Sequence, residues 1–140
     1  MGVPYNSEEG VALAEEISRR CAAIGRRMDI LLEVNIGGEA SKSGFAKGEL
    51  EGVLPQIAAL PGVRITGLMA IPPAAEGDGA APYFREMEQL FIDIKHERLD
   101  NVFMETLSLG MSGDFETAVS CGSTQVRLGS ILFGERQSQI

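Results

Sequence analysis

The stretch MDILLEVNI, residues 28–36, sets the fold class of this chain. It is a short apolar run with β-branched residues, about as long as a strand and too short for a typical helix. Runs of the same kind recur at VRITGLMAI (63–71), FMETLSL (103–109) and VRLGSILF (126–133). Nearly continuous apolar runs are typical of parallel strands covered on both faces, so we predict a strand at each of these places.

The segments between these runs show the spacing of helices. Apolar residues recur every three or four positions in 8–24, 47–60 and 82–98, and a short helix is expected at about 114–121. Pro55 lies inside the second of these helices and should kink or split it. Alternating helices and strands indicate an α/β fold with a parallel sheet and right-handed crossovers.

Two architectures fit this order of elements: a doubly wound sheet, or part of a (β/α)₈ TIM barrel. A complete barrel needs about 200 residues or more. The 140 residues of this chain can supply about half of one. This length suits one hydrophobic core rather than two ordinary domains, so we expect residues 1–140 to form a single domain.

Composition and charge argue against several classes of protein. The chain has 12 Lys and Arg against 20 Asp and Glu, a net charge of −8, and so lacks the basic surface of a nucleic-acid binder. No apolar run reaches the roughly 18 residues of a membrane span, and the first residues do not resemble a signal peptide. Two cysteines without a Cys/His cluster predict neither a disulfide framework nor a metal site. We therefore expect a cytoplasmic protein.

Glycine and serine residues follow the last two predicted strands at their carboxyl ends, the edge at which parallel α/β folds bind ligands. Ser112-Gly113 precedes the short helix, so backbone N–H groups and a hydroxyl could hold a phosphate there. Gly129-Ser130 offers a second bare backbone and a second hydroxyl. Most Gly-Ser turns are only turns, so the pattern by itself leaves a phosphate site and two plain turns as alternatives.

Arg127 lies inside an apolar run, two residues before Gly129 and on the same face. Because arginine is rarely buried unpaired, either a nearby carboxylate pairs with it or it is a fixed cation that points into a ligand cavity. Glu33 and Asn35 share a face of the first strand. For Glu33 we expect an internal pair with Arg64 or Arg127 rather than catalysis.

No residue pattern indicates a catalytic centre. The sequence has no Ser/His/Asp constellation and no P-loop. His96 lies on a predicted amphipathic helix and is expected at the surface, whereas Cys21 and Cys121 fall on the apolar stripes of helices. Lys42 lies in a Ser/Gly-rich loop, where a solvated lysine is more common than one that forms a Schiff base. We predict no catalytic residue.

Three stretches carry a resemblance to a known family: LLEVNIGGEASKSGF (31–45), VRITGLMAIPP (63–73) and LSLGMSGDFETAVSCGSTQVRLGSILFGER (107–136). In content and order they resemble the pyridoxal-phosphate homeostasis proteins, small single-domain relatives of the alanine-racemase barrel. The resemblance runs from about residue 6 to residue 136. It implies a (β/α)₈ barrel of the alanine-racemase type with pyridoxal 5′-phosphate at its mouth.

The resemblance also implies roles for individual residues. Ser112 with Gly113, and the Gly129-Ser130 turn, resemble the groups that hold the phosphate of the cofactor, a place that free phosphate or sulfate could also take. Arg127 resembles the residue that faces the pyridine nitrogen. Two further residues resemble those that line the site, namely Asn35 and Met69.

The family's cofactor lysine lies on the first barrel strand, and this chain resembles only the carboxyl-terminal half of the family. Lys42 matches a loop lysine rather than the lysine that forms the Schiff base. We therefore expect a partial, truncated barrel in residues 1–140 that binds the cofactor without a covalent aldimine. Exposed sheet edges in such a half-barrel favour self-association.

Three functions remain open at this stage. The first is a non-catalytic carrier and regulator of pyridoxal phosphate in vitamin B6 homeostasis, because an arginine opposite the pyridine nitrogen weakens the cofactor's electron sink. The second is an amino-acid racemase or decarboxylase of the same fold, which needs a positioned acid or base. The third is a fragment without a function of its own, since a fold by itself does not imply an activity.

Overall fold

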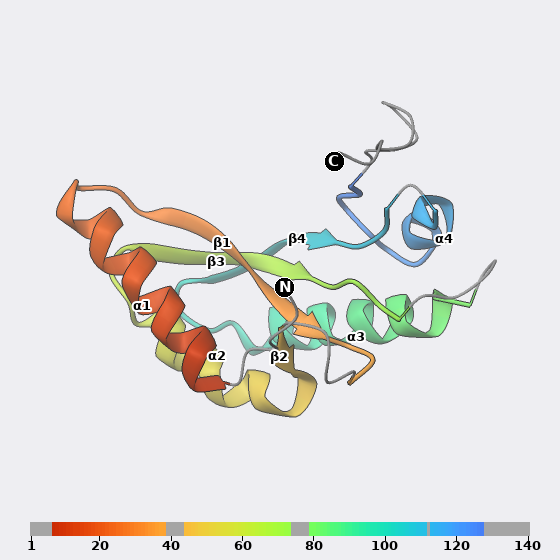
Figure 1. The fold of residues 1–140 in the computed structure, drawn as a ribbon, viewed down its shortest axis with the longest axis horizontal. Helices are drawn as coiled ribbons and strands as arrows, with labels where there is room; N and C mark the ends of the chain where they lie inside the picture. Colours follow the sequence, from red (N-terminus) through yellow and green to blue (C-terminus); the bar gives the residue numbers. More distant parts are fainter. Residues whose placement is uncertain (1–6, 39–43, 74–78, 112, 128–140) are drawn as a thin grey trace, which may run out of the picture.

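The computed structural model describes residues 7–38, 44–73, 79–111 and 113–127. Within these ranges helices and parallel strands follow one another along the chain (Figure 1). In chain order the elements are α1 (Ser7–Ala23), β1 (Met28–Asn35), β2 (Phe45–Ala46), the short 3-10 helix η1 (Lys47–Glu49), α2 (Leu50–Ala58), β3 (Val63–Met69), α3 (Ala81–Glu97), β4 (Val102–Ser108) and α4 (Phe115–Ser120).

The strands form one parallel sheet in the order β2-β1-β3-β4. The predicted strands at 28–36, 63–71 and 103–109 are confirmed as β1, β3 and β4. The two-residue strand β2 was not predicted, because two residues are too few to show a period. Of the predicted strand at 126–133 the structure describes only the first two residues, and the residue before them, Gln125, forms a parallel bridge with Ser108.

The four predicted helices are confirmed with boundaries shifted by up to three residues. The expected split at Pro55 is wrong: α2 continues through this residue, and the change of helix type falls instead between Glu49 and Leu50. Pro55 and Glu51 are both exposed, so water can satisfy the Glu51 carbonyl that receives no N–H from the proline. None of the helices in the described ranges is long and apolar enough to cross a bilayer.

Helices α1, α2 and α3 cover one face of the sheet (Figure 1). The core lies between them and the strands, and it is built from fully buried side chains such as Leu54, Leu68, Phe84, Met87 and Leu107. Burying an apolar side chain of this size contributes about 1.5–3 kcal/mol relative to leaving it exposed. The apolar stripes read from the sequence are therefore the surfaces that fix the helices to the sheet.

The sheet is irregular at the middle of β3. Its register with both neighbouring strands shifts between Ile65 and Gly67. A Cβ atom at Gly67 would lie 1.8 Å from the carbonyl oxygen of Thr106, a distance that no side chain could adopt without moving β4. Glycine at this position therefore permits the close approach of the two strands, and it fixes which residues stand side by side farther along them.

Candidate functional site

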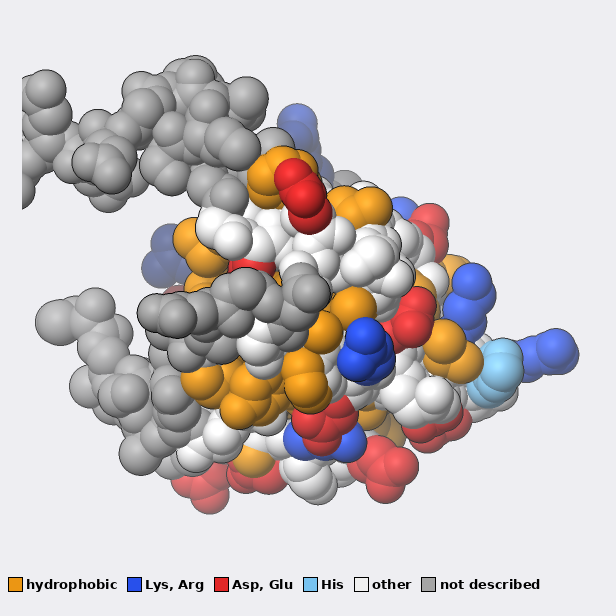
Figure 2. Space-filling model, turned by 90° about the vertical axis from the view of Figure 1, so that its right-hand side faces the viewer, with side chains coloured by type: hydrophobic (Ala, Val, Ile, Leu, Met, Phe, Trp, Pro, Cys, Tyr) orange, Lys and Arg blue, Asp and Glu red, His pale blue; other side chains and the backbone are white. Residues whose placement is uncertain are grey.

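Three side chains form a row at the carboxyl ends of the strands. Glu33 of β1 pairs in register with Met69 of β3, and Met69 with Ser108 of β4. Their preceding neighbours are buried in the core with the helices, namely Leu32, Leu68 and Leu107. Since side chains alternate along a strand, the row faces the opposite side of the sheet from the helices. Figure 2 looks onto this end of the molecule, where hydrophobic side chains gather with acidic side chains at their margins.

Arg127 is fixed to this row by its side chain and its backbone. Its Nη1 donates to the Oγ of Ser108 at 2.5 Å and to the Ser108 carbonyl at 3.2 Å, and its Nη2 donates to the Ala70 carbonyl at 3.2 Å. The Arg127 N–H donates to the Gly110 carbonyl at 2.9 Å. The guanidinium group is thereby held across the ends of β3 and β4. Both residues that accept from it are buried, with 1 % of Ser108 and 0 % of Ala70 exposed.

Burial lowers the pKa of the Arg127 guanidinium from its ordinary value, and the negative charges of Asp114 and Glu33 oppose this effect. An arginine pKa is high enough that the group stays protonated at neutral pH despite such a shift. Arg127 is therefore a half-buried permanent cation that only donates hydrogen bonds. A group that stays charged and only donates can hold an acceptor atom of a ligand, but it cannot transfer a proton.

Of the two partners expected for Glu33, Arg64 or Arg127, the first pairs instead with Asp29. Arg64 donates from Nε and Nη2 to the Asp29 carboxylate at 2.9 and 3.0 Å, and Asp29 stands directly opposite it in the β1–β3 register. This bond and the charge of Asp29 raise the pKa of Arg64. The charge of Glu33 acts instead on Arg127, the other partner considered from the sequence.

The predicted cofactor-binding residues divide into two groups. Asn35, two residues beyond Glu33 at the end of β1, and Met69 in the row are both half-buried. Gly113 is exposed and precedes α4, which begins at Phe115 where about residue 114 was predicted. Three other predicted residues lie outside the described residues, namely Ser112, Gly129 and Ser130, as does Lys42.

No role was predicted for two residues of the site, Ser108 and Ala70, which accept the hydrogen bonds of Arg127. For Ser108 a signal was present, because it is a polar residue between Leu107 and Leu109 in an otherwise apolar stretch. A buried hydroxyl in such a place needs a partner. For Ala70 there was none, because it contributes only its backbone carbonyl.

A cavity of about 410 Å³ borders the row on the side of β1. Its lining includes Glu33 and Met69 of the row, Leu31 of β1 and Leu13 of α1. The cavity is mostly apolar with one carboxylate at its edge, which is the usual composition of a small-molecule site. No group of three or more His, Cys, Asp or Glu side chains in the described part of the chain is placed to hold a metal ion.

Known proteins resemble this chain in sequence and in fold. The model of the family described as "Alanine racemase, N-terminal domain" matches residues 6–137. The pyridoxal phosphate homeostasis protein of Aquifex aeolicus is 42% identical over 126 residues, which cover 89% of this chain and 54% of that protein. PipY of Synechococcus elongatus, solved with PLP bound, has a TM-score of 0.78 at 31% identity, over 88% of this chain and 57% of that one.

An alanine racemase of Clostridium difficile shares the fold alone, with a TM-score of 0.70 at 16% identity over 92% of this chain and 34% of that one. The chain spans about half the length of the curated relatives that it matches. The strands at 28–36, 63–71 and 103–109 thus correspond to part of an alanine-racemase-like α/β barrel. The curated relatives that the chain resembles are named pyridoxal phosphate homeostasis proteins, and because the family model matches nearly the whole chain, the chain belongs to the alanine racemase N-terminal domain family.

Proposed function

We propose that this chain binds pyridoxal 5′-phosphate at the carboxyl ends of its strands, as a non-catalytic carrier and regulator in vitamin B6 homeostasis. The observation that carries the proposal is the position of Arg127, whose guanidinium is fixed by Ser108 and Ala70 at the Ser108 end of the row. The relative solved with PLP bound supports the choice of ligand.

The residues of the site fit a pyridine ring. Arg127 stays protonated and only donates hydrogen bonds, so the ring atom that it contacts must be an acceptor. The unprotonated nitrogen of a pyridine ring is such an acceptor. When bound, pyridoxal phosphate supplies an electron sink that is strongest with its ring nitrogen protonated. By holding that nitrogen unprotonated, Arg127 would keep the cofactor unreactive, as a carrier requires.

The other contacts belong to the proposal as well. Asn35 and Met69 would line the ring, since both are half-buried on the strands that carry the site. The phosphate would lie at Ser112 with Gly113 and at Gly129-Ser130, the two Gly/Ser segments on either side of Arg127 in the sequence. Their resemblance to the family's phosphate-binding segments supports this choice, and free phosphate or sulfate would take the same place.

An amino-acid racemase or decarboxylase is the less favoured alternative. Such an enzyme needs an acid or base positioned at the reacting atoms. Arg127 cannot serve in that role, because a guanidinium group does not give up its proton at neutral pH. We place the carrier role in the cytoplasm, a location that bacterial relatives named for pyridoxal phosphate homeostasis support.

We further propose that residues 1–140 act as one partial barrel domain that self-associates through a sheet edge. β1 pairs with β2 only at Val34 and Asn35, and the described residues supply no strand beside the edge of Met28–Glu33. Unpaired N–H and C=O groups on a strand edge favour the addition of another strand. A molar mass that rises with protein concentration in light scattering is expected, and a constant monomer mass would contradict this part of the proposal.

The binding site is tested by titrating the chain with pyridoxal phosphate and following its absorbance. Arg127→Gln, which keeps an amide donor of similar length, should weaken binding at least tenfold. Arg64→Gln is the matched control, because this strand arginine on the same sheet pairs with Asp29 away from the site. If the two variants bound pyridoxal phosphate with equal affinity, the proposal that Arg127 contacts the cofactor would be wrong.

A further inference from the structure

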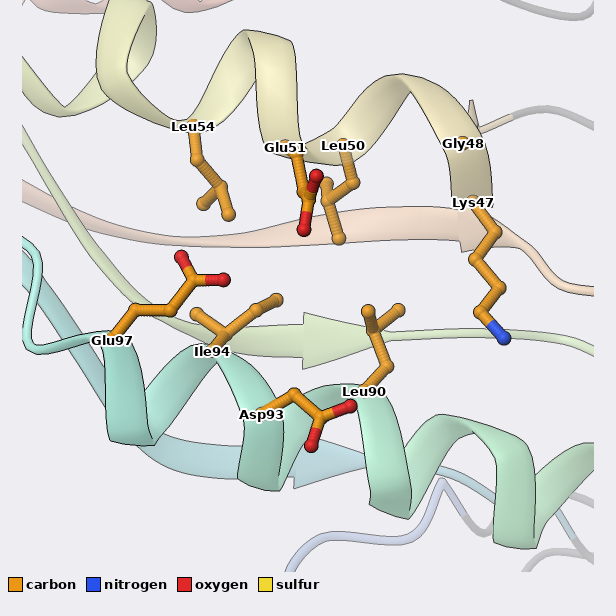
Figure 3. Close-up of a pocket in the computed structure, with 9 residues that line it drawn as sticks. All are labelled: Lys47, Gly48, Leu50, Glu51, Leu54, Leu90, Asp93, Ile94 and Glu97. Carbon is orange, nitrogen blue, oxygen red and sulfur yellow. The ribbon is translucent and has the colours of Figure 1, made fainter.

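The outer face of the molecule carries a groove between α2 and α3 (Figure 3). The cavity there measures about 340 Å³. Leu50 and Leu54 reach into it from α2, and Leu90 and Ile94 reach toward them from α3. The two helices pack on the sheet but make few direct contacts with each other. The groove therefore has an apolar floor, in which Leu50, Leu54 and Ile94 are almost fully buried and Leu90 is the half-buried side chain that a ligand could contact.

Carboxylates surround this apolar floor. Glu51 of α2 and Asp93 and Glu97 of α3 all line the cavity, and all three side chains belong to exposed residues. The one cation in the lining is Lys47, whose ammonium group already pairs with the carboxylate of Glu86 at 2.8 Å. The groove thus presents three negative charges beside an apolar surface and offers no unpaired positive charge in return.

This arrangement of charges is unfavourable for the helix that carries most of it. Asp93 and Glu97 stand four residues apart on α3, the spacing at which like charges repel. Glu97 is also the last residue of α3, at the end where the helix dipole is negative, although Lys95 and His96 in the same turn supply the basic side chains that this end prefers. Asp93 accepts a hydrogen bond from Gln89 at 2.8 Å, which leaves its charge in place. A cation bound in the groove would relieve the repulsion between the two carboxylates.

We propose that the α2–α3 groove docks a basic segment of a partner protein by taking up one of its arginine or lysine side chains. Such a side chain has an apolar stem and a charged head, which match the apolar floor and the carboxylate rim. A metal ion is not the occupant we choose, because no described group of acidic side chains is placed to coordinate one. The groove lies on the helical side of the sheet, so docking there leaves the strand ends free.

The test is the binding of a fluorescein-labelled, alanine-based peptide with three arginines, followed by fluorescence anisotropy at low ionic strength. The same peptide with glutamine in place of arginine is the ligand control. In the protein, Glu51→Gln with Glu97→Gln removes two charges of the rim while keeping the size of the side chains. Glu8→Gln with Glu15→Gln removes the same net charge from exposed positions of α1, outside the groove.

We expect the groove variant to bind the arginine peptide at least tenfold more weakly and the α1 variant to bind within twofold of the unchanged protein. Leu90→Lys, which supplies the groove with its own cation, should abolish binding, and circular dichroism checks that each variant is folded. Equal losses in the two double variants would show that only net charge attracts the peptide, and would overturn the proposal. Spermidine that binds as tightly as the peptide, or no preference for arginine over glutamine, would overturn it as well.

Discussion

Replacing Arg127 by alanine should lower the stability of the fold as well as the affinity for a ligand. The change removes three side-chain hydrogen bonds, two to Ser108 and one to the carbonyl of Ala70. A hydrogen bond to a charged group contributes about 1.5–3 kcal/mol, and water entering the half-exposed site would replace part of that. We therefore expect the free energy of unfolding to fall by about 2–4 kcal/mol, or roughly 6–16 °C in Tm for a chain of this size.

Arg64→Ala is the comparison that makes this prediction sharp. Arg64 forms an ion pair with Asp29 through two hydrogen bonds, whereas Arg127 bonds only to neutral acceptors. The guanidinium carbon of Arg64 also lies 5.2 Å from the centre of the Phe103 ring. Its side chain and that of Asp29 are 38% and 54% exposed, however, and water and salt screen exposed ion pairs. The Tm of this variant should stay close to that of the unchanged chain.

Thermal unfolding followed by circular dichroism, at one protein concentration and neutral pH, measures both variants. Ser108→Ala should reproduce part of the Arg127→Ala loss, and the double variant should lose less than the sum, because the two residues share their bonds. If Arg64→Ala and Arg127→Ala lower Tm equally, the neutral, buried acceptors do not anchor Arg127 as argued. An unchanged Tm for Arg127→Ala would refute the reasoning outright.

A Cβ atom at Gly67 would lie 1.8 Å from the Thr106 carbonyl oxygen, so Gly67→Ala should cost about 2–3 kcal/mol or more of unfolding free energy in urea. Gly52→Ala, in open space on α2, should instead gain about 0.5–1 kcal/mol. Asn101→Ala removes two hydrogen bonds from its amide and should cost about 1–3 kcal/mol in the same assay. Borohydride reduction with pyridoxal phosphate should leave no stoichiometric pyridoxyl adduct, because an imine-forming lysine needs an apolar pocket or neighbouring cation. A single-site adduct on Lys42 in peptide mass maps would contradict this.

The apolar runs predicted the main strands because short runs of this kind are typical of parallel strands. In the structure only β3 is buried along most of its length, whereas β1 and β4 keep exposed residues. The helices were predicted because each buries a single stripe against the sheet. The strand β2 gave no such signal. Phe45 is buried, but a strand of two residues has no alternation to detect.

The partners in the site were harder to predict because they depend on strand register. Whether Glu33 or Asp29 meets Arg64 is decided by which residues of β1 and β3 stand opposite each other. The sequence does not give that alignment, since a shift of the register leaves the apolar pattern of each run unchanged. The partner of Ser108 could not be predicted for a similar reason. Its hydroxyl was visible as a polar residue in an apolar run, but the donor to it, Arg127, lies on a later segment whose position the sequence does not give.

The irregularity in β3 explains how the row of the candidate site comes to exist. Below it, Ile30 of β1 stands opposite Ile65. If that alignment continued, Met69 would stand opposite Val34, a residue buried in the core with the helices, rather than Glu33. The register shift between Ile65 and Gly67 therefore moves the end of β3 by one residue relative to β1. As a result Met69 stands opposite Glu33 and shares its face of the sheet. Bulges of this kind re-aim side chains next to functional sites. The alignment of Glu33 with Met69, beside the anchored Arg127, thus depends on the register shift next to Gly67, where a Cβ atom would clash with the carbonyl of Thr106.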